Sequence, residues 1–196
     1  MKHYFTDNTD LKSEQSQFIF RFHKYDLLFT SDNGVFSKSM IDYGSRVLLD
    51  NIKITNEKTL LDVGCGYGTF GICLNKVYSY LNVDMVDVND RALELAKLNA
   101  KNNNIHANIY KSFIYENVQG SYDVIVTNPP VRAGKEVVTT ILQESIEHLN
   151  ENGSLWVILQ KKQGAPSAKK KMEEVFGNCE IVKRDKGYYL LHSVKR

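Results

Sequence analysis

The chain has 196 residues, of which 42% are hydrophobic and 24% charged, and its net charge is +2. This is the size of one α/β domain with a single sizeable core, and no apolar run approaches the roughly 20 residues of a membrane span. The N-terminus lacks the apolar region of a signal peptide, and the three cysteines form no C-x-x-C pair. We therefore expect one cytoplasmic domain, residues 1–196, with reduced thiols rather than disulfides or zinc.

Residues 1–50 are expected to be a small addition that packs on the core. The alternating aromatic residues of Phe18–Phe29 predict a β-hairpin, and Asp32-Asn33-Gly34 is a turn signal. Ser37 is a candidate N-cap for a helix that runs to about Asp50.

A glycine-rich loop follows the next apolar run. Thr59 to Val63 predicts a buried strand, and Gly64-Cys-Gly-Tyr-Gly68 comes directly after it, before a helix from Thr69. Glycines let the backbone turn sharply and approach a ligand, and the free N–H groups of the helix start face the same ligand. The stretch predicts a nucleotide-type cofactor site, but not a dinucleotide site, because Thr69 stands where the third glycine of G-x-G-x-x-G belongs.

Predicted strands and helices alternate from this loop to Phe176. The expected strands are 81–87, 108–112, 122–127 and 154–159, and the expected helices are 90–102, 137–149 closed by Asn152-Gly153, and one that Ser167 caps. Residues 179–182 and 188–194 predict a closing hairpin. The order predicts a mostly parallel sheet with right-handed crossovers and one antiparallel strand at the end.

Asp87 ends the second strand of this series, nineteen residues beyond Gly68. An acid in this position accepts hydrogen bonds from ribose hydroxyls in nucleotide sites of this topology. The alternative is an acid beside a helix start, since Asn89 and Asp90 begin the next helix. Asp84 is the weaker candidate for the ribose contact.

Asn128-Pro129-Pro130 follows the fourth strand. The prolines fix the backbone and lack N–H groups, so their carbonyls are free to face a ligand, and the Asn128 side chain adds an acceptor. Two acceptors that converge on one point suit a substrate –NH2, whose lone pair can then face the donor of a transferred group. The alternative is a rigid turn at the end of a strand.

Asp62, the three glycines, Asp87 and Asn128-Pro129-Pro130 together resemble an amino-directed class I S-adenosylmethionine-dependent methyltransferase. Adenine-N6 DNA and glutamine-N5 enzymes of that group usually have an aromatic residue after the prolines, whereas this chain has Val131. Residues 128–135, with 34–37 and 42–45, are instead similar to the small-subunit ribosomal RNA guanine-N2 methyltransferase family, from His3-Tyr4-Phe5 to the C-terminal strands. Full-length members carry two tandem domains, and this chain matches the catalytic one.

The resemblance implies a Rossmann-like fold with a seven-stranded sheet, and S-adenosyl-L-methionine as cofactor. It places in the cofactor site Phe36, Ser37, Asp62, Gly64, Cys65, Gly66, Gly68, Asp87, Val88, Ser112, Phe113 and Asn128. Asn128, Pro129 and Pro130 would be catalytic, and Val131, Arg132 and Lys135 would lie at the substrate mouth. No metal is implied, because the five histidines show no ligand spacing.

The implied reaction is methylation of an exocyclic guanine amine in RNA, with rRNA or a ribosomal subunit as the partner. Residues 160–196 carry ten Lys or Arg against four acids, which favours a phosphate-bearing partner or marks a solvated lysine-rich helix face. Alternatives are methylation of a small molecule or of a protein side-chain amide, and a cofactor-binding or RNA-binding module without catalysis. No membrane partner is expected, and the oligomeric state stays open between monomer and homodimer.

Overall fold

The computed structural model describes residues 10–196, so the resemblance at His3-Tyr4-Phe5 lies outside the described residues. A large sheet contains β3 (Thr59–Val63), β4 (Asn82–Asp87), β5 (Asn108–Lys111), β6 (Tyr122–Thr127), β7 (Leu149–Gln160), β8 (Glu180–Asp185) and β9 (Tyr188–Val194). A separate hairpin consists of β1 (Ser16–Phe22) and β2 (Tyr25–Ser31). The α-helices are α1 (Tyr43–Asn51), α2 (Thr69–Val77), α3 (Asp90–Asn102), α4 (Lys135–Glu144) and α5 (Ala165–Phe176). Three 3₁₀ helices complete the described chain: η1 (Val131–Ala133), η2 (Ser145–His148) and η3 (Lys161–Gln163).

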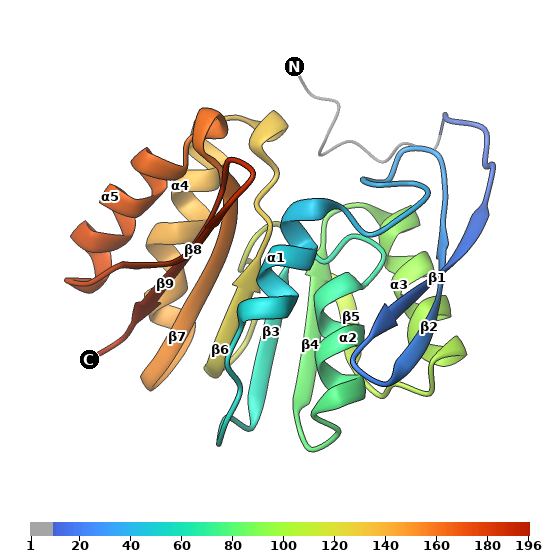
Figure 1. Ribbon diagram of the computed structural model, residues 1–196, viewed down its shortest axis with the longest axis horizontal. Helices are drawn as coiled ribbons and strands as arrows, with labels where there is room; N and C mark the ends of the chain where they lie inside the picture. Colours follow the sequence, from blue (N-terminus) through green and yellow to red (C-terminus); the bar gives the residue numbers. More distant parts are fainter. Residues whose placement is uncertain (1–9) are drawn as a thin grey trace.

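The large sheet has the strand order β5-β4-β3-β6-β7-β9-β8. Its pairs are parallel except that β9 is antiparallel to both β7 and β8. The predicted mostly parallel sheet with one antiparallel strand is thus confirmed. In Figure 1 the loops that follow β3, β4, β6 and β7 all meet at the upper edge of the sheet, which is its carboxyl edge.

Helices cover both faces of the sheet, and each face has its own core. Neighbouring residues on β3 divide between them: Leu60 packs with α1, α2 and α3, whereas Leu61 packs with α4 and α5. This follows from the two-residue period of a strand, which sends successive side chains to opposite faces. Burial on both faces explains why the central strands are nearly continuous apolar runs.

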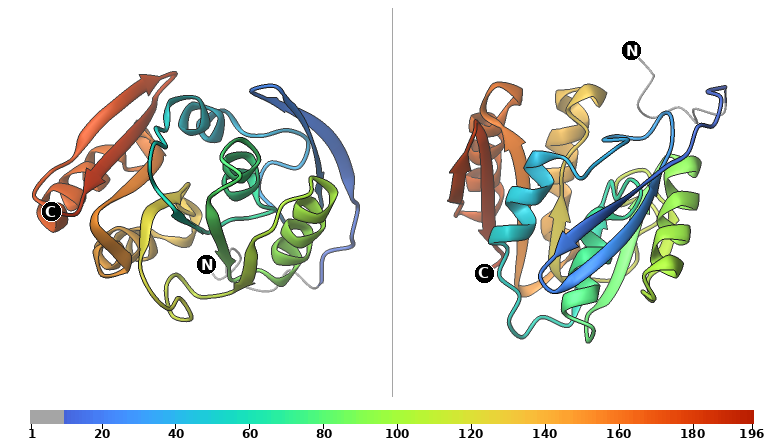
Figure 2. Two further views of the ribbon diagram at one scale, coloured as in Figure 1. Left: turned by 90° about the horizontal axis from the view of Figure 1, so that it is seen from below. Right: turned by 45° about the vertical axis from the view of Figure 1, so that its right-hand side comes forward.

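The hairpin is fixed to α3 by two asparagines. Asn99 accepts a hydrogen bond from the Thr30 amide at 2.7 Å and donates to the Thr30 carbonyl at 2.9 Å, and Asn103 makes the same pair with Leu28 at 3.0 and 2.8 Å. The asparagines are four residues apart on one helix face, so they serve as partners for backbone groups of β2 that β1 does not pair. The right-hand view of Figure 2 shows the hairpin lying beside α3.

The predicted helix start at Ser37 is wrong. Helix α1 begins at Tyr43, and Asp42 is its N-cap, with Oδ2 accepting from the Ser45 amide at 3.0 Å. The segment before it has other partners, because the Ser37 carbonyl accepts from Tyr67 and the Lys38 carbonyl from the hairpin side chain of Ser16. These contacts hold the segment in a non-helical form that a capping preference alone does not reveal.

Two further boundaries differ from the predictions. Asn152-Gly153 does not close a helix but lies inside β7, where the pairing with β6 shifts register. A Cβ on Gly153 would lie 2.9 Å from the Tyr122 carbonyl oxygen, so this irregular turn requires glycine. Helix α5 begins two residues before Ser167, with Gly164 at its N-cap and a proline in its first turn.

Candidate active site

The loops at the carboxyl edge of the sheet surround a cavity of about 250 Å³. The glycine loop after β3 lines it on one side and the Asn128–Arg132 segment after β6 on another. Val35 and Phe36 of the segment before α1 also line it, as does Tyr188 at the start of β9. The cavity therefore lies where a parallel α/β sheet places its ligands.

The backbone of the glycine loop is held against β4. The amides of Gly64 and Cys65 both donate to the Val86 carbonyl at 2.9 Å. Gly64 and Gly66 have φ values of +71° and +56°, and a Cβ on either would meet no protein atom within 4 Å. Both conformations favour glycine, and the loop backbone is open toward a ligand.

Gly68 has a different role from the other two glycines. It is the N-cap of α2 with φ +100°, and a Cβ on it would lie 2.7 Å from Cδ1 of Ile72. It does not line the cavity. The positive φ at this N-cap therefore favours glycine for the start of α2, whereas the sequence prediction placed Gly68 in the cofactor site.

Asp87 lines the cavity and also orders the loop. Its Oδ2 accepts from the Gly66 amide and its Oδ1 from the Asn89 amide, each at 2.9 Å. Burial raises the pKa of Asp87, and the backbone donors partly offset this by favouring the ionised form. The carboxylate thus holds the glycine loop in place against the end of β4.

Asp62 lies beneath the loop rather than in the cavity wall. Its Oδ2 accepts from the Gly71 amide in α2 at 3.0 Å, while its buried Oδ1 has no hydrogen-bond partner among residues 10–196. Burial raises the pKa of Asp62 to about 7, and the nearby charge of Asp87 adds to the rise. Asp62 therefore ties β3 to α2, and its side chain does not line the cavity.

Asn128 and Pro129 carry two acceptors and line the same cavity as the glycine loop. The Thr127 hydroxyl donates to the Val63 carbonyl at 2.9 Å, so the ends of β6 and β3 are tied together just before these loops. Nδ2 of Asn128 donates to Asp42 and Ser45 at 3.4 and 3.3 Å. Within residues 10–196, neither Oδ1 of Asn128 nor the Pro129 carbonyl accepts a hydrogen bond, whereas the Pro130 carbonyl accepts from Ala133.

The structure brings most of the predicted site residues to this cavity. Those that line it are Phe36, Gly64, Cys65, Gly66, Asp87, Val88, Ser112, Asn128, Pro129, Pro130, Val131 and Arg132. Ser37, Phe113 and Lys135 do not line it, in addition to Asp62 and Gly68. Ser37 presents its carbonyl to Tyr67 at 3.1 Å, and Phe113 is 47% exposed while Ile114 takes the position in the wall.

Sequence reasoning missed part of the wall. Asp42 and Ser45 come from the first turn of α1, Gln160 from the end of β7 and Tyr188 from the start of β9. Nε2 of Gln160 donates to the Tyr188 hydroxyl at 2.8 Å. The position of Tyr188 could have been predicted, because the first residue of an antiparallel strand lies at the carboxyl edge of its parallel neighbours.

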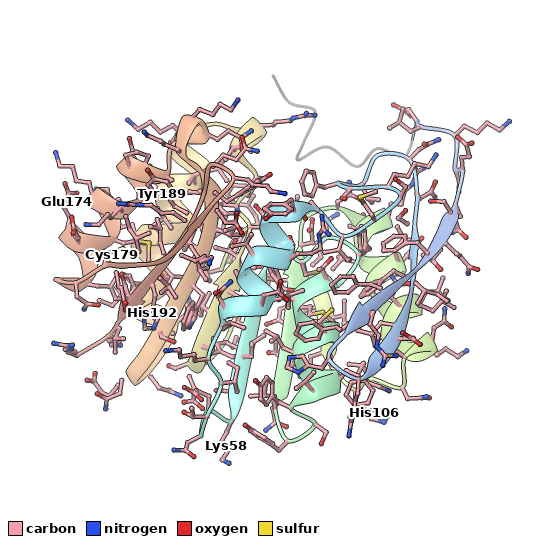
Figure 3. The ribbon with its side chains drawn as sticks, viewed as in Figure 1. Lys58, His106, Glu174, Cys179, Tyr189 and His192 are labelled. Carbon is pink, nitrogen blue, oxygen red and sulfur yellow. The ribbon has the colours of Figure 1, made fainter. Side chains whose placement is uncertain are left out.

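No group of three or more metal-ligating side chains occurs within residues 10–196. Figure 3 shows His106 and His192 on opposite sides of the molecule. The same part of the chain contains no helix long and apolar enough to span a membrane. Its three cysteines are free thiols, and Cys65 and Cys73 are buried.

Comparison with known proteins decides the family. The family model "Methyltransferase small domain" matches residues 26–192, which include the glycine loop and the Asn-Pro-Pro segment. The chain belongs to this family. As a methyltransferase small domain, it is 44% identical to "Uncharacterized protein YbxB" of Bacillus subtilis, over 99% of this chain and 98% of that protein.

Two further relatives carry descriptions of an activity. This methyltransferase small domain is 30% identical to "Ribosomal RNA small subunit methyltransferase C" of Vibrio cholerae, over 87% of this chain and 50% of that protein. It is similar in fold to the T. thermophilus 16S rRNA N2 G1207 methyltransferase, solved with AdoMet and guanosine, with a TM-score of 0.85, 23% identity and coverage of 95% of this chain and 52% of that one. The chain thus spans about half the length of these two relatives.

Proposed function

We propose that this chain transfers a methyl group from S-adenosyl-L-methionine to the exocyclic N2 amine of a guanine in RNA, with small-subunit rRNA as the target. The observation that carries the proposal is the pair of free acceptors on Asn128 and Pro129, two residues that line the same cavity as the glycine loop. The names of the Vibrio cholerae and T. thermophilus relatives support the target.

The residues of the cavity fit the proposed cofactor. Gly64 and Gly66 leave open space where side chains would stand, and Asp87 offers a half-buried carboxylate to hydroxyl groups. Val88, which follows β4, and Ile114, which follows β5, supply apolar side chains to the cavity wall. When bound, S-adenosyl-L-methionine supplies an electrophilic methyl group and leaves as a neutral thioether.

The chain's own contribution is to orient the amine. The Asn128 Oδ1 and the Pro129 carbonyl would accept the two N–H groups, which fixes the direction of the nitrogen lone pair. As the nitrogen gains positive charge, these preorganised dipoles bind its hydrogens more strongly than in the ground state. After it accepts the methyl group, the nitrogen would release a proton to solvent.

The cations around the cavity suit an RNA partner. Arg132, Lys161 and Lys162, which we call the rim cations, are exposed and form no ion pair within residues 10–196. Arg132 lines the cavity, and the lysines lie between its lining residues Gln160 and Gln163. In contrast, Lys169 and Lys171 of α5 are paired with Glu173 and Glu174.

Transfer of tritium from labelled cofactor tests the proposal. Purified small-subunit rRNA and small ribosomal subunits would be offered beside tRNA, DNA and total protein, and the labelled nucleoside would be identified after digestion. We expect labelled N2-methylguanosine only in the digests of the rRNA or of the small ribosomal subunit, and not in those of the other substrates. Label only in protein or in small molecules would refute the RNA target.

Asn128→Ala provides the matched catalytic test. Loss of one transition-state dipole should lower kcat on the order of 10²-fold or more. Affinity for S-adenosylhomocysteine, measured by calorimetry, should persist. A variant that loses this affinity instead would contradict the role given to Asn128.

A further inference from the structure

Asn128 does not stand alone at the end of β6, because its side chain is held from the first turn of α1. Its Nδ2 lies 3.4 Å from Oδ2 of Asp42 and 3.3 Å from the Ser45 hydroxyl. Ser45 is buried, with 4% of its surface exposed, and both residues line the cavity. The contacts join residues more than eighty positions apart in the sequence.

The chemistry of Asp42 decides which way the Asn128 carboxamide points. An ionised carboxylate accepts hydrogen bonds and donates none, so only the –NH2 end of the amide can face it favourably. The opposite orientation would place the amide oxygen against a negative charge. The oxygen is therefore directed away from α1 and stays available for a substrate hydrogen.

Asp42 is itself held in place by the helix that it caps. Its Oδ2 accepts from the Ser45 amide at 3.0 Å, in addition to the Asn128 contact. The N-terminus of a helix favours a negative charge, so the helix and the carboxylate stabilise each other. One capping interaction thus fixes both the start of α1 and the acceptor that faces the cavity.

We infer that Asp42 and Ser45 are positioning residues, which orient the Asn128 carboxamide so that its oxygen receives the methyl-accepting amine. The inference rests on the proposed function, since it gives Asn128 the role described above. It gives residues 1–50 a part in the site, because Asp42 and Ser45 lie there rather than in the strands and loops that form the cofactor site.

A series at position 42 separates orientation from capping. Asp42→Ser keeps a good N-cap, but its short side chain does not reach Asn128. Asp42→Asn keeps the length of the side chain and removes its charge, so its kcat should lie between those of Asp42→Ser and the wild type. Ser45→Ala removes the hydroxyl that contacts Asn128. It keeps the backbone amide of residue 45, which donates to Asp42, so the cap of α1 is unchanged.

For Asp42→Ser we expect kcat to fall about 10- to 100-fold, as for loss of a hydrogen bond to a charged group, with a smaller fall for Ser45→Ala. The KM for RNA, the affinity for S-adenosylhomocysteine and the Tm should stay near the wild-type values. A fall in Tm that accounts for the lost activity, or kcat equal to wild type, would overturn the inference.

A measurement without turnover tests the orientation itself. The Asn128 side-chain amide signals are those that disappear from the ¹⁵N–¹H spectrum in Asn128→Ala. Cross-peaks from these amide protons to the Ser45 β protons are expected in the wild type and should be lost in Asp42→Ser. Their absence in the wild type would overturn the inference.

The outcomes also separate this inference from the proposed function. If Asn128→Ala is inactive while Asp42→Ser and Ser45→Ala are fully active, the role of Asn128 stands and the positioning role fails. If Asn128→Ala is itself fully active, the role proposed for Asn128 fails as well.

Discussion

At the scale of single residues, Asp62 and Asp87 lie near the ends of the neighbouring strands β3 and β4 but bond different groups. Asp87 binds the Gly66 amide inside the loop and faces the cavity. Asp62 binds the Gly71 amide in α2 and has one oxygen without a partner among the described residues. One carboxylate is therefore placed to meet a ligand, and the other connects strand to helix.

Asp87→Ala should weaken cofactor binding about 10- to 100-fold, because the ligand contact and the order of the Gly66 amide are lost together. Asp84→Ala is the matched control on the same strand, since Asp84 bonds Asn108 and Tyr122 rather than lining the cavity. Calorimetry with S-adenosylhomocysteine measures both. An unchanged dissociation constant for Asp87→Ala would refute the ribose contact.

Asp62 should make stability depend on pH. Its pKa is about 7 in the folded chain because of burial, against 3.8 for an exposed carboxyl. Between these values the folded state binds one proton more than the unfolded state, so the free energy of unfolding falls as pH rises, by up to about 1.4 kcal/mol per pH unit. The contribution is fully present below about pH 4 and is lost above about pH 7.

Asp62→Asn removes this titration. Urea unfolding of both proteins at pH 5, 6, 7 and 8 should show the wild type losing stability relative to the variant as pH rises toward 7. The comparison cancels the titration of the groups that do not interact with Asp62. A constant difference across this range would contradict a raised pKa at Asp62.

At the scale of elements, α1 is built into the wall of the cavity. Its cap holds Asn128, and its Gly44 packs against Tyr188 so closely that a Cβ would lie 2.5 Å from Cε1 of that ring. The Tyr188 hydroxyl in turn accepts from Gln160. The first turn of α1 therefore connects the ends of β6, β7 and β9 around the acceptor side of the cavity.

Gly44→Ala should displace the Tyr188 ring, since backbone and ring cannot both stay in place at that distance. We expect lower kcat/KM for RNA and a loss of stability of about 1–3 kcal/mol, with cofactor affinity kept. In Tyr188→Ala the clash is absent, so Gly44→Ala should cost little stability in that background. An equal stability cost in both backgrounds would refute the contact as the cause.

At the scale of the whole molecule, the cations of residues 160–196 include one group beside the cavity and another on α5. The rim cations lie at the carboxyl edge around the cavity, while Lys169 and Lys171 of α5 are paired with Glu173 and Glu174 along that helix. Figure 3 places Glu174 at the outer side of α5 and Lys58 at the opposite edge of the sheet from the cavity loops. The basic residues of 160–196 thus include cations beside the cavity, free of ion pairs within the described residues, and lysines that are paired with acids on a helix surface.

A double substitution Lys161→Ala/Lys162→Ala should weaken RNA binding and reduce its salt dependence. Each lost phosphate contact lowers the slope of log K against log salt by about 0.7 to 0.9. Lys169→Ala/Lys171→Ala is the control of equal charge and should change both quantities less. Equal effects of the two pairs would contradict a specific role for the rim cations.

The sequence by itself determined the sheet and much of the cavity. Apolar runs predicted the buried strands, glycines predicted the turn after β3, and Asn-Pro-Pro predicted the end of β6. These predictions were possible because each signal lies within a few consecutive residues. The order of strands and helices then determined the parallel topology, which places the ends of β3, β4 and β6 at one edge. Hence Gly64, Asp87 and Asn128 could be placed together without coordinates.

Only the tertiary structure decided how the site is completed. Serine and aspartate both favour an N-cap position, so Ser37 and Asp42 were both candidates, and contacts from Tyr67 and the hairpin decided that the helix begins after Asp42. Two further features depend on which side chains meet in the folded chain. Gly68 lies against Ile72 and outside the cavity wall, and Tyr188 packs against Gly44. These contacts join distant parts of the chain, and no local preference specifies them.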